Sequence, residues 1–155
     1  MRRNVKRFCL VVLLVTACAA PMRAGVRDDL LQKAFNYLFT GTIDPQDTPE
    51  IVDLTACAVV VPDPRYPRFI RYYFGRIRPD NSRISKDYAG RQTLYKLEIE
   101  SDNIVIEYLT ADKATVTQAF RSAQINLPGD LEQTQKALKV IAERCKGDGS
   151  KSPFS

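Results

Sequence analysis

The segment LYKLEIESDNIVIEYL, residues 94–109, carries the most regular pattern in this 155-residue chain and indicates its fold class. Apolar side chains occupy every second position on both sides of a Ser-Asp-Asn triplet: Tyr95, Leu97 and Ile99, then Ile104, Ile106 and Tyr108. Alternation with a period of two is typical of strands with one buried face, and the triplet is typical of a turn. We therefore predict two successive antiparallel strands, separated by a turn at residues 101–103.

Further strands are expected on both sides of this pair. Residues 51–61, IVDLTACAVVV, end in a β-branched apolar run that suits a central strand. Residues 68–78, RFIRYYFGRIR, follow the proline-rich loop 62–67 and are expected to form the next strand. Residues 114–121, ATVTQAFR, are the fifth candidate, with a short helix as the alternative.

Amphipathic helices are predicted at both ends of this strand region. Asp28 and Asp29 place acids at a helix start, and apolar residues then recur at helical spacing up to Gly41. Asp130 stands as an N-terminal cap before residues 131–145, whose apolar stripe ends at a cysteine. The sequence therefore predicts an α+β fold: an N-terminal helix, an antiparallel meander of four or five strands, and a C-terminal helix packed on the sheet.

The first 24 residues have the pattern of a secretory signal peptide. A run of 13 uncharged, largely apolar residues at 8–20 follows four bases: Arg2, Arg3, Lys6 and Arg7. The run is too short for a membrane-spanning helix, which needs about 20 residues, but it suits a signal sequence. We expect cleavage before Gly25, with a site five residues earlier as the alternative. One exported domain at 25–145 and a disordered tail at 146–155 would remain.

A lipoprotein signal is another interpretation of the same segment. Residues 15–18, Val-Thr-Ala-Cys, resemble the bacterial lipobox, whose cysteine becomes the acylated first residue of the mature protein. Acylation of Cys18 would anchor the domain to a membrane, whereas ordinary cleavage would make it periplasmic or secreted. We expect contact with a membrane only through the signal peptide or this anchor.

Export would leave two cysteines to pair. Cys9 leaves with the signal and Cys18 leaves or carries lipid, so Cys57 and Cys145 remain in an oxidising compartment. Redox pairs usually have C-x-x-C spacing, and two cysteines without histidine make no zinc site. We predict a structural disulfide between Cys57 and Cys145, which stabilises the fold by roughly 4–5 kcal/mol in the chain-entropy model.

The composition argues against several classes of function. Residues 1–24 hold five of the 23 bases and none of the 18 acids, so the mature chain is neutral and we expect no nucleic-acid binding. The chain has no histidine, which excludes Ser-His and Cys-His dyads and imidazole metal sites. The sequence also lacks the glycine motifs that bind nucleotides. We assign no catalytic residue, no metal site and no cofactor.

One stretch differs from this neutral background. Residues 65–96 contain nine bases and two acids, interleaved with tyrosines. Arginine and tyrosine together suit a surface that binds a planar anion or a protein partner. The candidate binding residues are Arg68, Arg71, Tyr73, Arg76 and Arg78. Alternatively, these bases pair across strands with the five acids of residues 98–112 and serve only the sheet.

We therefore expect a small exported, disulfide-linked domain with a non-catalytic binding or structural role in the bacterial cell envelope. Its partner would be another envelope protein or a small anionic ligand. Two rivals stay open, namely a lipid-anchored subunit of an envelope assembly and an enzyme that uses carboxylates, arginine and tyrosine on an anionic substrate. The binding role is favoured because the chain carries no catalytic motif.

The signal pattern gives the first testable prediction. Intact-mass measurement of protein recovered from the cell envelope should show that the first 17 to 24 residues are missing, because signal peptidases remove such segments. A mass increased by acyl chains would identify lipidation at Cys18. Full-length protein in the cytosol would contradict export.

Overall fold

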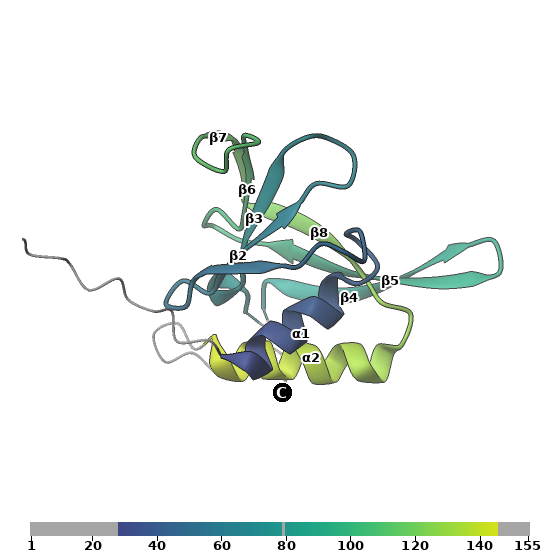
Figure 1. Cartoon of the computed structure of the whole chain (residues 1–155). Helices are drawn as coiled ribbons and strands as arrows, with labels where there is room; N and C mark the ends of the chain where they lie inside the picture. Colours follow the sequence, from purple (N-terminus) through teal and green to yellow (C-terminus); the bar gives the residue numbers. More distant parts are fainter. Residues whose placement is uncertain (1–27, 79, 146–155) are drawn as a thin grey trace, which may run out of the picture.

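The computed structural model describes residues 28–78 and 80–145 and confirms the α+β class. Within these residues, two helices lie together on one side of antiparallel sheets (Figure 1). The elements in chain order are α1 (Asp29–Phe39), β1 (Glu50–Asp53), β2 (Ala58–Pro62), β3 (Phe69–Tyr73), the 3-10 helix η1 (Phe74–Arg76), β4 (Ser82–Ala89), β5 (Gln92–Glu100), β6 (Ile106–Leu109), β7 (Val116–Phe120), β8 (Ser122–Leu127) and α2 (Leu131–Arg144). The predictions about the signal segment, Cys18 and the tail at 146–155 lie outside the described residues.

The strands form two antiparallel sheets. The order is β1-β2-β3-β6-β7 in the five-stranded sheet and β4-β5-β8 in the three-stranded sheet. β6 therefore pairs with β3 and not with β5, the strand that precedes it in the chain. The predicted meander is thus replaced by an arrangement in which consecutive strands can belong to different sheets.

The predicted turn at residues 101–103 is where the chain changes sheets. β5 ends at Glu100 opposite Ser122, and β6 begins at Ile106 opposite Phe120. Five residues therefore separate β5 from β6, whereas only Arg121 separates β7 from β8. A backbone hydrogen bond of 2.9 Å from Ser101 N to Arg121 O holds this bulge. The extra residues bend one long hairpin so that its two halves join different sheets.

Backbone geometry divides two of the predicted strands. Residues 51–61 form a tight hairpin of β1 and β2, because Cys57 takes a left-handed φ of 47° between them. The basic run 68–78 ends as a strand at Tyr73 and continues as η1.

β4 and β8 were not predicted. The composition of β4, which is rich in serine and charged residues, is typical of a loop. The strand nevertheless pairs with β5 over its whole length. β8 was missed because only one residue separates it from β7, so no turn signal marks where it begins. Its buried residues are Ala123, Ile125 and Leu127, at every second position.

Aromatic residues form the centre of the core between α1 and the helix-facing side of the five-stranded sheet. The ring centroids of Phe35 and Phe74 lie 4.9 Å apart, and those of Phe39 and Tyr72 lie 5.4 Å apart. α2 packs beside α1 and closes this core with Leu138 and other apolar residues (Figure 1). The predicted amphipathic faces therefore meet each other as well as the sheet.

The predicted N-terminal cap at Asp130 is confirmed, and Asp28, which was expected in the first turn, is instead the N-terminal cap of α1. The Asp28 carboxylate accepts a hydrogen bond from Leu31 N at 3.1 Å, and the Asp130 carboxylate accepts one from Gln133 N at 3.0 Å. Each bond satisfies a backbone donor that a helix start otherwise leaves without a partner.

The predicted disulfide between Cys57 and Cys145 is present. The two residues are 88 positions apart in sequence, and their Cα atoms lie 5.3 Å apart. Both side chains are buried, and Cys145 is the C-terminal cap of α2. The bond therefore joins the end of the last helix to the turn between the first two strands.

The contact between η1 and the same turn requires glycine at position 75. Gly75 N donates to Ala56 O at 3.3 Å, and Phe74 N donates to Cys57 O at 3.0 Å. A Cβ atom on residue 75 would lie 2.7 Å from Ala56 O, which is backbone and cannot rotate away.

Replacement of this glycine should therefore destabilise the protein. Gly75→Ala should lower the free energy of unfolding by about 1–3 kcal/mol, because η1 must shift away from the turn. The matched control is Gly129→Ala, whose Cβ would meet nothing within 4 Å and should change stability by less than about 0.5 kcal/mol. Urea denaturation with the disulfide intact measures both values, and equal effects of the two substitutions would contradict the steric explanation.

Candidate functional site

Of the five residues proposed from the sequence, Arg71, Tyr73 and Arg76 form one cluster, whereas Arg68 and Arg78 make contacts of their own. Arg71 and Tyr73 project from the outer face of β3, opposite the buried Ile70 and Tyr72. The outer face is the side of the five-stranded sheet that faces away from α1. The other three residues, Arg68, Arg76 and Arg78, lie outside the strand, so the set forms no single patch.

Arg71 and Tyr73 both bind Glu107 of β6, and Arg76 lies beside Tyr73. The Glu107 carboxylate accepts hydrogen bonds from Arg71 Nη1 at 3.0 Å and from the Tyr73 hydroxyl at 2.8 Å. The Arg76 guanidinium lies 4.1 Å from the centroid of the Tyr73 ring, a cation–π contact. An extended chain would place residues 73 and 76 on opposite faces, so η1 is what brings Arg76 to this cluster.

Burial and mutual contacts fix the charge states in the cluster. Burial raises the pKa of the Tyr73 phenol, and its hydrogen bond with Glu107 adds to the rise while Arg71 opposes it. Burial alone would lower the pKa of Arg71, but contacts with Tyr73 and Glu107 outweigh it and raise that pKa. Arg71 is therefore charged and paired across strands, which matches the alternative role offered by the sequence.

Arg68 closes the loop between β2 and β3. Its Nε donates to the Asp63 carboxylate at 2.7 Å, and its guanidinium lies 3.9 Å from the Tyr108 ring centroid and 4.7 Å from that of Tyr66. The backbone of the same loop is tied by a 2.9 Å hydrogen bond from Asp63 N to Arg68 O. These contacts give Arg68 a defined structural role.

Arg78 lines an open depression of about 980 Å³ beside the bulge at residues 101–105. The charged residues of its lining are three bases and three acids: Arg76, Arg78, Arg121, Asp80, Glu100 and Asp102. Because the two signs balance, the depression provides no net positive field for an anion. It is a weaker candidate for a ligand site than its arginine content alone indicates.

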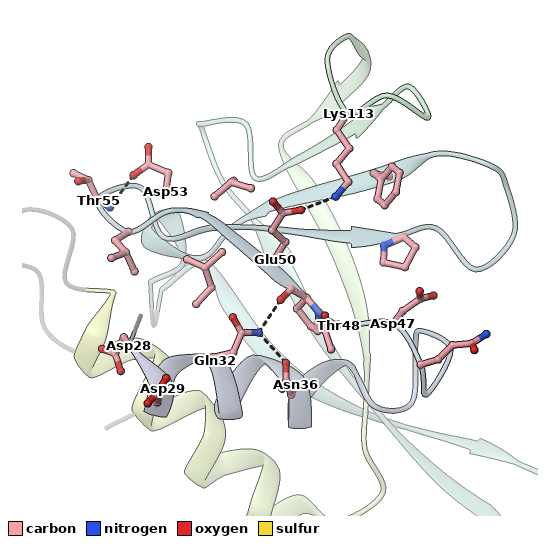
Figure 2. A pocket seen from close by; sticks show the side chains of 17 residues that line it. Asp28, Asp29, Gln32, Asn36, Asp47, Thr48, Glu50, Asp53, Thr55 and Lys113 are labelled. Carbon is pink, nitrogen blue, oxygen red and sulfur yellow. Dashed lines mark hydrogen bonds and ion pairs between the residues drawn. The ribbon is translucent and has the colours of Figure 1, made fainter. Parts of the chain in front are cut away.

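A groove of about 1190 Å³ between α1 and β1 is a stronger candidate (Figure 2). Its lining has five acids and one base: Asp28, Asp29, Asp47, Glu50, Asp53 and Lys113. Apolar side chains contribute as well, and Val52 and Leu54 remain 44% and 42% exposed. The groove is therefore acidic and partly apolar, in contrast to the neutral composition of residues 25–155.

One wall of this groove is the edge of a sheet. Among the described residues only β2 pairs with β1, so the other side of β1 has no strand neighbour. Gln32 links α1 to the residue that precedes β1, because its side-chain nitrogen donates a hydrogen bond to Pro49 O at 2.7 Å (Figure 2). An edge of this kind presents backbone N–H and C=O groups that another strand can pair with.

Lys113 closes the groove on the side of the β6–β7 loop. It pairs with Glu50 (Figure 2), and its ammonium lies 4.6 Å from the centroid of the Phe69 ring. Lys113 has a φ of 60°, so the loop takes a sharp turn there. Lys113 thus neutralises Glu50, and Arg144 of α2 pairs with Asp28 at 3.1 Å. The other three acids of the lining are Asp29, Asp47 and Asp53, so the groove stays acidic.

Sequence reasoning missed this groove because its residues come from three separate segments, at 28–36, 46–69 and 113. The signal that was available is the placement of acids around the short apolar pair Ile51-Val52, which is typical of an edge strand. Residues 51–61 were instead predicted as a single central strand.

Two further searches covered only the part of the chain that the structure describes. No three side chains of histidine, cysteine, aspartate or glutamate come together there as a metal site. Neither α1 nor α2 is long and apolar enough to cross a membrane.

The Glu107 cluster gives a testable prediction about stability. Glu107→Gln should lower the free energy of unfolding by about 1–2 kcal/mol, because it leaves the half-buried Arg71 charge without its counter-ion. Glu98→Gln is the control, since Glu98 pairs with the largely exposed Arg83 and should cost less than about 1 kcal/mol. Urea denaturation compares the two. A larger effect at Glu98 would contradict the structural role of the Glu107 pair.

Comparisons of the chain with protein-family models, with curated proteins and with solved structures found no significant match. The function therefore has to be inferred from the geometry and charge of the candidate sites.

Proposed function

We propose that this protein is a small exported domain with a non-catalytic binding role in the bacterial cell envelope, and that the α1–β1 groove holds an extended, basic segment of a polypeptide. The observation that carries the proposal is the combination of an unpaired strand edge with five acids and one base in a single groove.

Strand addition to an exposed edge is a common mode of peptide recognition. The backbone hydrogen bonds of the added strand supply affinity, and pockets for alternate side chains supply specificity. Here the apolar side chains of Val52 and Leu54 suit apolar residues of the segment, while the surrounding carboxylates suit its lysines or arginines.

Two observations support the envelope as the compartment. Residues 1–24 have the composition of a signal peptide, and the buried Cys57–Cys145 disulfide suits an oxidising compartment. If Cys18 carries lipid, the protein that contains this groove is itself anchored to a membrane, as in the envelope-assembly alternative.

Site-specific photo-crosslinking in living cells tests this function. A photoreactive amino acid at Val52 should form covalent adducts in the envelope fraction, and mass spectrometry should locate the crosslink in a basic, extended segment. The paired substitutions Gln46→Lys and Asp47→Lys should abolish these adducts, because they remove one negative charge from the groove and add two positive charges.

The control places the same photoreactive amino acid at Gln135, an exposed position on α2. Equal adducts at positions 52 and 135, or none at position 52, would refute the groove as the binding site.

A further inference from the structure

The β4–β5 hairpin extends beyond the sheet to which it belongs. β8 accompanies β5 only as far as Tyr95, which pairs with Leu127. The pairs Asp87–Leu94, Tyr88–Thr93 and Ala89–Gln92 lie beyond that point and belong to the hairpin alone. Figure 1 shows this part projecting away from the helices and from the other sheet. We call residues 82–96 the arm.

The arm is basic and partly apolar. It contains four bases, Arg83, Lys86, Arg91 and Lys96, and one acid, Asp87. Lys96 pairs with Asp87 and Arg83 pairs with Glu98, so Lys86 and Arg91 are the bases without an ion pair among the described residues. Tyr88 is 66% exposed and Leu94 is 40% exposed. A two-stranded hairpin of this kind gains little stability by itself in water, so its projecting part would gain from a further strand.

The arm and the groove are complementary in three respects. β4 is an edge strand of its sheet and β1 is an edge strand of the other, so each offers backbone groups for pairing. The arm has four bases and one acid, and the groove lining has five acids and one base. With Glu98, which pairs with Arg83, and Arg144, which pairs with Asp28, also counted, the arm has a net charge of +2 and the groove a net charge of −3. Both carry exposed apolar side chains.

These charges also select which edges can meet. Pairing of β4 with β4 would place bases near bases, and pairing of β1 with β1 would place acids near acids, and both contacts are destabilising. Pairing of β4 with β1 brings opposite charges together. Because the arm projects away from its own domain, the complementary edge must belong to another molecule (Figure 1).

We propose that the groove of one molecule binds the β4–β5 arm of a second copy, with β4 added antiparallel to β1. This inference rests on the proposed function of the groove and names its occupant. The contact joins two different surfaces, so each molecule uses its arm on one neighbour and its groove on another. Such head-to-tail contacts produce open chains or rings.

Sedimentation velocity of the purified, disulfide-bonded protein tests the inference. The weight-average mass should rise with protein concentration from about 10 to 500 µM in about 20 mM salt, and it should fall back to the monomer value in about 500 mM salt, where the charges are screened. A wild-type protein that stays monomeric over this range in low salt would overturn the proposal.

Two variants with altered charge identify the surfaces. Lys86→Glu with Arg91→Glu alters the arm, and Gln46→Lys with Asp47→Lys alters the groove. None of these four residues forms an ion pair within residues 28–78 and 80–145, so the substitutions leave those ion pairs intact. Each variant alone should be monomeric, since every contact then includes one altered surface.

The decisive measurement uses an equimolar mixture of the two variants. The intact arm of the groove variant fits the intact groove of the arm variant, so the mixture should form a 1:1 dimer and nothing larger. A mixture that stays monomeric, or a variant that oligomerises alone, would contradict the inference. Lys139→Glu on the exposed face of α2 is the control and should assemble like the wild type.

Thermal melting identifies any variant that fails to fold. Such a variant is replaced by Tyr88→Ser for the arm or by Val52→Lys for the groove, and the same results are expected.

The test also separates the inference from the proposed function. Crosslinks from Val52 to another protein, together with a monomeric wild type, would reject self-assembly and retain the groove. The absence of any crosslink at Val52 would reject both.

Discussion

The backbone reversal at Cys57 is the constraint on which the rest of the structure depends. Its left-handed conformation folds residues 51–61 into the β1–β2 hairpin and so creates the free edge of β1. Its carbonyl oxygen accepts a hydrogen bond from Phe74, which fixes the start of η1, and its sulfur is bonded to the end of α2. The five-stranded sheet, η1 and α2 are therefore positioned by one residue.

The parts of the fold that could be predicted are those determined by local periodicity. Both helices, the existence of two strands within residues 94–109 and the disulfide follow from spacing and caps that a single sequence displays, although those two strands join different sheets. The division at Cys57 could not be predicted, because a cysteine rarely adopts positive φ and does so here within a turn held by tertiary contacts. The partition into two sheets was hidden for a similar reason, since it depends on five residues opposing the single Arg121.

The candidate site was predicted less well than the fold. Counting charges located the basic stretch correctly, but the role of each base depends on a neighbour that is distant in sequence, such as Glu107 for Arg71 and Asp63 for Arg68. The acidic groove escaped notice because the whole chain is nearly balanced once the first 24 residues are set aside. Neutral composition here conceals a separation of charge, with acids on one edge of the molecule and bases on a projecting hairpin.

The position of Cys145 has a consequence for the order in which the molecule matures. During synthesis Cys57 precedes its partner by 88 residues, and Cys145 follows directly after the last helix. The bond therefore cannot direct the first pairing of strands, and it closes on a chain whose other elements have already been made. The disulfide therefore forms only after every described strand and helix has been synthesised, and it joins the end of the last helix to the turn between the first two strands.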